Sequence, residues 1–249
     1  MFVDTMKSFY DSNGYLVVEG LFGEEELGPI RRRTDEIVEC PESAPEGVSI
    51  GREGDTVGDK SGPQARSKTI RGTAFLARFD PVFQDFACHP KMLAIVRGLL
   101  GAHIKLFRDQ MLLKPPGGQA KPLHQDQSYF RVQPQDGLVT AWCALDDATL
   151  ENGCMCYVPG SQKYGIFDVT KDPERPVHHI PDTRDIDLNE PVQCPVPAGS
   201  VIFHHGCTLH NSKTNDTETW RRAVILHYTT KTAASETERL NREVSLEID

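Results

Sequence analysis

The sequence predicts a mainly β fold, in which a helical N-terminal layer packs on an antiparallel jelly roll, and three observations support this prediction. From Ile104 onward, short apolar runs are bounded by Gly, Pro, Asn and Asp, which is typical of sandwiches and barrels. Before residue 100, the apolar residues are spaced mostly as in helices. A length of 249 residues suits one large β domain, so we expect a single domain over residues 1–249.

The first hundred residues are expected to be largely helical. Helices are predicted over 6–13, 24–39 and 80–100, and Gly14 separates the first helix from a short strand at 15–18. Residues 41–66 are rich in Pro, Gly, Ser and charged residues. A structureless segment of this composition is either disordered or functional, and we expect it to act as a lid over the site.

The jelly-roll core is expected over residues 101–235, and residues 236–249 are expected to form a C-terminal tail. Short apolar runs between turn residues predict strands at 105–113, 138–145, 154–158, 192–196, 200–205 and 222–229. This β scaffold carries the motifs from which a function is inferred.

Charge and hydropathy argue against two classes of partner. The net charge is -9, whereas nucleic-acid binding needs clustered Lys and Arg. The one basic run, residues 31–33, lies in a predicted helix and is interpreted as a solvated face. No stretch approaches the roughly 20 apolar residues of a membrane span. We therefore expect neither nucleic acid nor a membrane as a partner.

Cysteine usage and the chain ends suggest a location. Seven cysteines without a C-x-x-C pair indicate reduced thiols rather than a disulfide framework. Residues 1–20 contain no secretory signal, and residues 246–249 are not a peroxisomal address. These features predict a cytoplasmic protein whose partner is a small-molecule substrate, and they leave the oligomeric state open.

An H-x-D pair, His124 and Asp126, predicts a metal site. On an extended chain, residues i and i+2 point to the same side, so both side chains can meet one ion. His210 is the best candidate for a third ligand, and His204 is either a supporting residue or a core histidine. Two histidines and one carboxylate leave coordination positions open, which suits Fe(II) oxygen chemistry. The alternative is a His and an Asp that only hydrogen-bond in a loop.

A carboxylate clamp is predicted beside the third ligand. If the strands that flank Asn215 and Asp216 form a hairpin, Arg221 pairs with His210 on one face, and Ser212 points the same way. A guanidinium grips a carboxylate through two parallel hydrogen bonds, and a hydroxyl adds a third. A metal beside such a clamp matches a keto acid such as 2-oxoglutarate.

Over nearly its whole length, the sequence resembles the phytanoyl-CoA dioxygenase family of 2-oxoglutarate oxygenases. The stretches that carry the resemblance are Asn13-Gly14-Tyr15-Leu16-Val17-Val18, His124-Gln125-Asp126, Glu151-Asn152-Gly153-Cys154, Val158-Pro159-Gly160-Ser161, and His210-Asn211-Ser212 followed by Arg221. The resemblance implies a double-stranded β-helix, a cupin-like jelly roll, with Fe(II) bound by His124, Asp126 and His210. It also implies 2-oxoglutarate and O2 as cosubstrates.

Several further residues take roles from this resemblance. Arg221 and Ser212 are expected to bind the distal carboxylate of 2-oxoglutarate. Gln110 and Trp142 match two further cosubstrate positions, although Trp142 is equally compatible with a plain core position. Arg71 matches a basic cosubstrate contact more loosely, and a surface arginine is the alternative.

The reaction that the resemblance implies is hydroxylation of a small organic substrate, with release of succinate and CO2. Related halogenases carry a small residue in place of Asp126, so the carboxylate favours hydroxylation, with desaturation or ring closure as alternatives. Tyr129 and Phe130 follow the H-x-D pair and are expected either to contact the substrate or to pack in the core. No basic pocket for the phosphates of coenzyme A is evident, so phytanoyl-CoA itself is not the expected substrate.

Two other functions stay open beside the oxygenase. One is a non-catalytic protein of the same fold that binds 2-oxoglutarate or a metal. The other is a zinc hydrolase or lyase on a similar barrel, which would be active without oxygen and would give no reason for the clamp.

Overall fold

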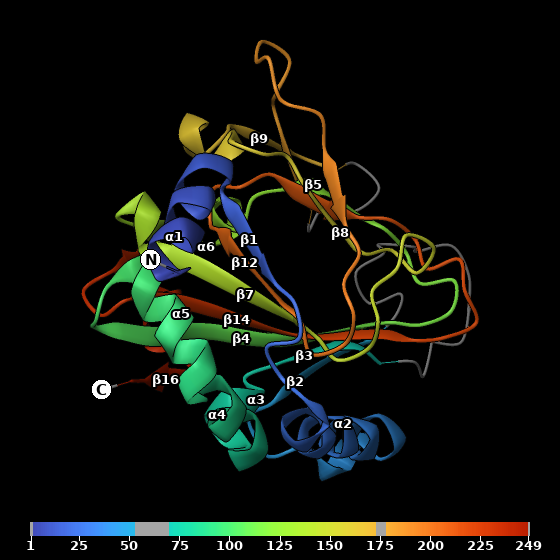
Figure 1. Cartoon of the computed structure of the whole chain (residues 1–249). Coiled ribbons are helices and arrows are strands. Elements are labelled where there is room, and N and C mark those ends of the chain that lie inside the picture. The colour runs from blue at the N-terminus through green and yellow to red at the C-terminus, as the bar shows by residue number, and fades with distance from the viewer. Residues whose placement is uncertain (1, 53–69, 173–177, 249) are drawn as a thin grey trace.

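Two antiparallel sheets form the centre of the molecule (Figure 1). The larger sheet has the strand order β1-β12-β7-β14-β4-β3-β2, with β16 also paired to β4, and the smaller has the order β11-β8-β13-β5. The structure is a computed structural model that describes residues 2–52, 70–172 and 178–248. The predicted mainly β jelly roll is confirmed.

The strands of the described residues are β1 Tyr15–Val18, β2 Ser49–Arg52, β3 Ile70–Ala74, β4 Ile104–Lys114, β5 Lys121–His124, β6 Val132–Gln133, β7 Leu138–Ala144, β8 Met155–Tyr157, β9 Val169–Lys171, β10 His179–Pro181, β11 Val192–Cys194, β12 Val201–His205, β13 His210–Ser212, β14 Arg221–Thr230, β15 Ala234–Ser235 and β16 Leu246–Glu247. The helices are α1 Phe2–Asn13, α2 Glu24–Glu39, α3 Leu76–Phe79, α4 Pro81–Ala87, α5 Pro90–Leu100, α6 Gln127–Phe130 and α7 Glu238–Arg242, with 3-10 turns at Pro41–Ser43, Gln135–Gly137 and Ser161–Tyr164. Within the described part of the chain, no helix has both the length and the apolar character that a membrane crossing requires.

Strand β7 is buried on both faces, which explains why six of its seven residues are apolar, Thr140 being the exception. Successive side chains of a strand point to opposite faces. Ala141 and Cys143 join the apolar cluster beneath the helices, whereas Trp142 and Ala144 join the cluster between the two sheets. A strand covered on both sides has no solvated face that would require polar residues. The side of Trp142 is therefore the side on which the two sheets meet.

Helices α2, α4 and α5 cover the outer face of the larger sheet (Figure 1). In α2, Leu27, Ile30 and Ile37 recur with helical spacing and are buried. The helix begins after Gly23, whose backbone N–H donates to the Glu26 carboxylate at 2.8 Å, and negative charge in the first turn matches the positive end of the helix dipole. Because these helices cover one face of the larger sheet, a site can form only on its opposite face, which looks toward the smaller sheet.

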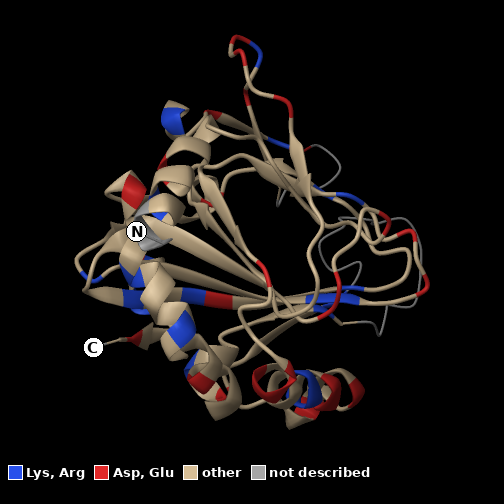
Figure 2. Cartoon of the chain, viewed as in Figure 1, with Lys and Arg blue, Asp and Glu red and all other residues tan. Residues whose placement is uncertain are grey.

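The basic run of α2 is neutralised by acidic neighbours. Arg31 pairs with Glu24 at 2.5 Å, and Arg33 pairs with Asp80 at 2.7 Å and with Glu36 at 2.8 Å. Figure 2 shows positions of both signs along this helix. The run is therefore part of an ion-paired surface.

The segment predicted to be structureless is partly ordered. Residues 41–43 form a 3-10 turn, and β2 pairs with β3 at the edge of the larger sheet. The prediction is therefore wrong for residues 41–43 and 49–52, and at 49–52 backbone pairing with β3 outweighs the polar composition. Residues 53–66 lie outside the described residues. At the other end, the predicted tail contributes α7 and β16, which pairs with β4.

The predicted hairpin between the segments that carry His210 and Arg221 is wrong. Strand β13 pairs with β5 and β8 in the smaller sheet, where His210 lies opposite His124. Strand β14 pairs with β4 and β7 in the larger sheet, where Arg221 lies opposite Lys114. The side chain of Asn215 donates to the Lys114 carbonyl at 3.1 Å, so the connecting loop is held where the chain passes from one sheet to the other.

Gly153 explains part of one sequence motif. Its φ is +78°, and a Cβ atom there would overlap the carbonyl oxygens of Lys213 and Thr214. Only glycine tolerates both this backbone conformation and this close approach. The loop before β8 is thereby packed against the end of β13, which begins with His210.

Candidate metal centre

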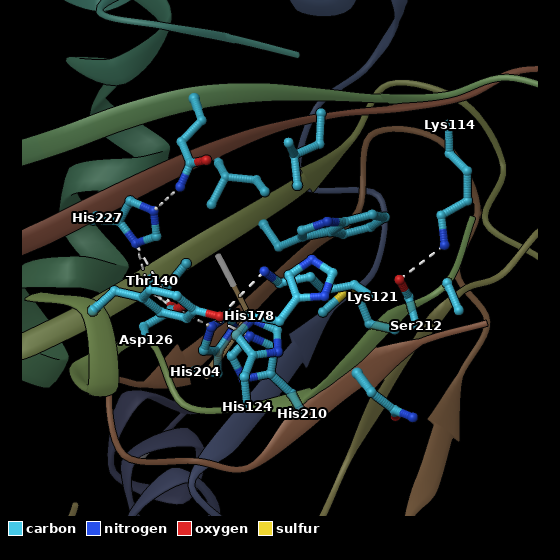
Figure 3. A pocket seen from close by; sticks show the side chains of 18 of the residues that line it. Lys114, Lys121, His124, Asp126, Thr140, His178, His204, His210, Ser212 and His227 are labelled. Atoms are coloured by element: carbon cyan, nitrogen blue, oxygen red, sulfur yellow. Dashed lines mark hydrogen bonds and ion pairs between the residues drawn. The ribbon is translucent and has the colours of Figure 1, made fainter. Parts of the chain in front are cut away.

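A cavity of about 400 Å³ lies between the two sheets and is lined by residues of β3, β4, β5, β7, β8, β12, β13 and β14. Figure 3 shows its walls from close by. The ten residues that the sequence suggested as metal, cosubstrate or substrate contacts all line this one cavity: Arg71, Gln110, His124, Asp126, Tyr129, Phe130, Trp142, His210, Ser212 and Arg221. Residues up to 150 positions apart in the chain thus meet in one place.

His124, Asp126 and His210 form a cluster with three potential metal ligands. Their ligand atoms lie within 4.8 Å of one another, and all three residues are buried. His124 ends β5 and lies directly opposite His210 on β13, while Asp126 has helical backbone angles at the start of α6. The extended conformation assumed for the H-x-D pair therefore ends at His124, and a strand-to-helix turn brings the carboxylate to the imidazoles.

Backbone carbonyls orient both imidazoles. Nδ1 of His124 lies 2.8 Å from the Pro122 carbonyl oxygen, and Nδ1 of His210 lies 2.9 Å from that of Thr208. A carbonyl only accepts hydrogen bonds, so each Nδ1 carries the proton. Each Nε2 is left with its lone pair, which is the arrangement found in metal-binding histidines.

Burial sets the charge state of the cluster. It lowers the pKa of His124 well below the usual value and the pKa of His210 to about 4, so both rings are neutral at pH 7. Burial alone would raise the pKa of Asp126, but His210, His204 and His227 outweigh this effect and hold that pKa well below its usual value. Two neutral nitrogen donors and one carboxylate suit a divalent transition metal.

One oxygen of Asp126 is held by two donors, and the other is left for a ligand. Oδ2 accepts hydrogen bonds from Thr140 Oγ1 at 2.6 Å and from His204 Nε2 at 3.0 Å (Figure 3). With its proton on Nε2, His204 accepts at Nδ1 from the Tyr157 hydroxyl at 3.0 Å. Oδ1 faces the Nε2 atom of His210 at 3.7 Å. The carboxylate is therefore oriented before any metal binds.

A second chain of donors also ends on Asp126. The single proton of Thr140 goes to Asp126, so Thr140 accepts from Nδ1 of His227 at 2.8 Å. Burial lowers the pKa of His227 to about 4, and the neutral ring accepts at Nε2 from the Gln110 amide at 2.9 Å. Sequence analysis missed Thr140 and His227. Thr140 precedes Trp142 by two residues on β7, so strand alternation was a signal that could have placed it in the cavity.

An arginine without an anion lies at the other end of the cavity. Arg221 is 3% exposed, and its guanidinium lies 5.3 Å from the centroid of the Trp142 ring. Among the described residues, nothing accepts a hydrogen bond from its Nε or from one terminal nitrogen. Each buried donor left unpaired costs about 1–3 kcal/mol, so the structure supports an anion at this position.

Other polar groups surround this end. Lys114, whose strand parity with Gln110 predicts that both face the site, donates to the Ser212 hydroxyl at 2.9 Å, and Lys114 and Ser212 lie across the cavity from Asp126 (Figure 3). Arg71 donates to the carbonyls of Leu113 and Gln119 at 2.9 Å and 3.0 Å. Burial, together with the charge of Arg71, lowers the pKa of Arg221 to about 10, so the guanidinium stays protonated at pH 7. Three cationic side chains thus lie around the position where the distal carboxylate of 2-oxoglutarate is expected.

The two residues suggested as substrate contacts differ in their surroundings. The Tyr129 ring stacks on His179 with centroids 4.3 Å apart. The Phe130 ring packs edge-on against Phe107 at 5.7 Å and His227 at 4.7 Å. Both line the cavity, but Phe130 also supports an inner wall, whereas Tyr129 presents a hydroxyl.

The chain is similar to known proteins over most of its length. The family model of phytanoyl-CoA dioxygenase (PhyH) matches residues 10–223. A probable phytanoyl-CoA dioxygenase of Caenorhabditis elegans is 29% identical over 236 residues, which cover 89% of this chain and 73% of the relative. The peroxisomal phytanoyl-CoA dioxygenase of Homo sapiens is 27% identical over 231 residues, which cover 89% and 67%.

A similar fold is found among solved structures. The epimerase SnoN, in complex with Fe3+, alpha ketoglutarate and nogalamycin RO, superposes with a TM-score of 0.76 at 24% identity. The match covers 96% of this chain and 89% of that chain. This likeness shows a shared fold.

Proposed function

The chain belongs to the phytanoyl-CoA dioxygenase family of 2-oxoglutarate-dependent non-haem iron oxygenases, and on this premise we propose that His124, Asp126 and His210 hold its Fe(II). We further propose that Arg221 and Ser212 bind the distal carboxylate of 2-oxoglutarate, and that the enzyme hydroxylates a small organic substrate.

One observation carries the assignment of the site. Three potential ligand atoms within 4.8 Å of one another share a cavity with a buried guanidinium that has unpaired donors. A three-residue site leaves coordination positions for a chelating cosubstrate and for O2, and the guanidinium supplies the partner for the far carboxylate. A structural zinc site would need a fourth protein ligand, and such a site would give no role to Arg221.

The residues of the chain bind and orient. Iron, 2-oxoglutarate and O2 supply the oxidising chemistry, with succinate and CO2 as co-products. His124 and His210 offer Nε2 because their Nδ1 protons are held by carbonyls, and Asp126 offers Oδ1 because Oδ2 is held by Thr140 and His204. Such pre-orientation lowers the cost of assembling the site.

The remaining wall positions the cosubstrate and limits water. Lys114 directs the Ser212 hydroxyl toward the position of the distal carboxylate. Trp142, Leu112 and Ile225 make that part of the wall apolar, which strengthens the pairing of Arg221 with an anion. The amide nitrogen of Gln110 already donates to His227, so we assign Gln110 to the support of Asp126.

Succinate release tests the function. We expect the Fe(II)-loaded protein to convert 2-oxoglutarate to succinate only in the presence of O2, and a metabolite library should contain compounds that stimulate the release. Binding of 2-oxoglutarate without succinate in any mixture would indicate the non-catalytic alternative. Activity that persists without oxygen would indicate the hydrolase or lyase.

Replacing Thr140 by valine is expected to weaken Fe(II) binding by about 10- to 100-fold, which is the usual cost of losing a partner of a metal ligand. The change removes the 2.6 Å hydrogen bond to Asp126 and the acceptor of the His227 Nδ1 proton. An anaerobic Fe(II) titration measures the effect, and the melting temperature of the metal-free protein checks the fold.

Thr229→Val is the matched control, because Thr229 is also buried in the larger sheet but its hydroxyl has no hydrogen-bond partner among the described residues. We expect it to bind Fe(II) as the wild type does. If Thr140→Val also binds Fe(II) with wild-type affinity, the hydrogen bonds that run through Thr140 do not orient Asp126.

The kind of substrate and the cellular location of the protein are two further proposals. A small-molecule substrate fits a cavity of about 400 Å³. The cytoplasmic location expected from the sequence stays a prediction, since the matched relatives include a protein named as peroxisomal. Cell fractionation with an antibody to the endogenous protein would decide between the two compartments.

A further inference from the structure

The charges around the cavity are unbalanced. Among the residues that the structure describes, one carboxylate, that of Asp126, and five basic side chains line the cavity: Arg71, Arg108, Lys114, Lys121 and Arg221. The whole chain has a net charge of -9, so this local excess does not follow from composition. A divalent iron and a doubly charged 2-oxoglutarate cancel each other, and the excess of positive charge therefore remains when both are bound.

Most of these cations have partners of their own. Arg108 pairs with Glu243 at 2.8 Å. Arg71 donates to two backbone carbonyls, and Lys114 donates to Ser212. Arg221 is the proposed partner of the cosubstrate. Lys121 is the one of these five cations to which none of these assignments gives a partner.

Lys121 is a cation at the cavity wall, near the cluster of ligands. It begins β5 and lies opposite Ser212 of β13, and Figure 3 shows it in the same cavity as His124 and His210. Its charge contributes to the lowered pKa of both imidazoles, and the Tyr129 ring beside it lies edge-on to His124, with centroids 5.9 Å apart. Within the described ranges, no carboxylate lies within 4.0 Å of its Nζ to form an ion pair.

Burial affects this amine strongly. It lowers the pKa of Lys121 to about 8, an effect that the charge of Asp126 opposes and the charge of Arg71 reinforces. Lys121 is half-buried, and an ammonium that is partly withdrawn from water is costly unless it is paired. An anion that enters the cavity would supply a charged partner.

Tyr129 supplies a second donor at the same place. Nζ of Lys121 lies 3.4 Å from the Tyr129 hydroxyl oxygen and 5.0 Å from the ring centroid. That oxygen also accepts from the backbone N–H of His179 at 3.0 Å, and the stacked His179 ring holds the phenol in place. The hydroxyl proton donates to no acceptor among the described residues. The ammonium and the phenol can therefore both donate to one oxyanion.

We infer that Lys121 and Tyr129 form the binding site for a carboxylate or phosphate group of the primary substrate, so that the enzyme acts on small anionic molecules. The inference rests on the proposed function and deepens it by naming the substrate class. This site is built on β5 and α6, whereas Arg221 of the cosubstrate clamp is on β14. Because Lys121 lies opposite the other clamp residue, Ser212, the variants below measure binding of the substrate and of 2-oxoglutarate separately. An anion held here lies beside the ligand cluster, which brings the rest of the substrate to the metal.

Matched pairs of compounds test the inference. Carboxylic acids would be compared with their carboxamides, and phosphate monoesters with the corresponding alcohols, using protein loaded with Fe(II) and 2-oxoglutarate. Binding is read as the shift of the melting temperature without oxygen, and turnover is read as succinate release with oxygen. We expect the anionic member of a pair to bind and to stimulate, and the neutral member to do neither.

Variants then locate the effect. Lys121→Met is expected to weaken binding of the anionic compound at least about tenfold, the scale of one lost charge-assisted hydrogen bond, while the dissociation constant of 2-oxoglutarate changes less than about threefold. Lys121→Arg should restore part of the affinity. Tyr129→Phe should weaken the same compound by a smaller factor, and Lys163→Met, an exposed lysine outside the cavity, should change nothing.

Three results would overturn the inference: equal stimulation by acids and their amides, unchanged affinity for the anion in Lys121→Met, or loss of 2-oxoglutarate binding in that variant. The last result would place Lys121 in the cosubstrate site. Failure of the proposed function looks different, because no mixture would then yield succinate even with the wild-type protein.

Discussion

Replacing Asp126 by alanine is expected to lower the rate of succinate release by more than about a hundredfold, because losing a ligand should exceed the 10- to 100-fold cost of losing a ligand's partner. Asp126 is the only carboxylate among the three clustered residues. Without it, two neutral imidazoles remain, and a divalent cation loses its one charged ligand. The measurements are an anaerobic Fe(II) titration and a succinate assay at saturating metal.

The fold should survive this change. Thr140 and His204 each lose an acceptor, and an unpaired buried donor costs about 1–3 kcal/mol, so a lower melting temperature with a cooperative transition is expected. Asp126→Asn keeps the size and an acceptor oxygen but removes the charge, and it should also lose Fe(II) binding. Asp182→Ala removes a carboxylate that pairs with Arg184 outside the cavity and should leave turnover intact. Normal turnover in Asp126→Ala would remove Asp126 from the metal site.

Replacing Arg221 by alanine is expected to raise the dissociation constant of 2-oxoglutarate about ten- to a hundredfold, since a hydrogen bond to a charged group contributes about 1.5–3 kcal/mol. The Fe(II) affinity should stay within a few-fold of the wild type, because Arg221 is not in the ligand cluster. Titration of the anaerobic Fe(II) protein with 2-oxoglutarate separates the two effects.

Thermal stability gives a second measure of the same change. In the ligand-free wild type, two nitrogens of the buried guanidinium find no acceptor in the described part of the chain, so Arg221→Ala is expected to melt at a similar or higher temperature without ligand. Addition of Fe(II) and 2-oxoglutarate should stabilise the wild type by mass action and the variant much less. An equal shift in both proteins would place the clamp elsewhere.

The neighbouring arginine is the matched control for this experiment. Arg222 points away from the cavity and forms two hydrogen bonds of 2.8 Å with Asp146. Arg222→Ala should lower the melting temperature through loss of this ion pair and leave the affinity for 2-oxoglutarate unchanged. Arg221 and Arg222 are neighbours on β14, so their side chains point to opposite faces of the sheet. The comparison of the two variants therefore also tests which face of β14 borders the cavity.

The sequence alone suggested the three residues that the structure gathers into the candidate ligand cluster. His124, Asp126, His210 and the clamp residues Ser212 and Arg221 were all recognisable from residue type, strand parity and resemblance to a family. Their arrangement was a different matter. The local hairpin argument paired His210 with Arg221, yet the two lie on different sheets. The correct cavity was predicted through an incorrect strand pairing.

The supporting groups were hidden for a related reason. Thr140, His227 and Tyr157 belong to three strands. Alternation with Trp142 could place Thr140 on the cavity face, but the local sequence does not show which group any of the three residues hydrogen-bonds. Their value comes from hydrogen bonds across the cavity that converge, directly or through a neighbouring residue, on Asp126. Such bonds depend on which strands become neighbours, and this depends on contacts between distant parts of the chain.

By itself, then, the sequence determined the strand-rich fold, the identity of three ligand candidates and the presence of a guanidinium suited to a keto diacid. Periodicity and residue chemistry are local properties, and they can be read without coordinates. The tertiary structure alone decided the pairing of β13 and β14 with different sheets, the orientation of Asp126, and the position of Lys121 beside Tyr129 with no ion-pairing carboxylate among the described residues. Each of these follows from packing two sheets face to face, where burial and hydrogen bonding join residues that the chain keeps far apart.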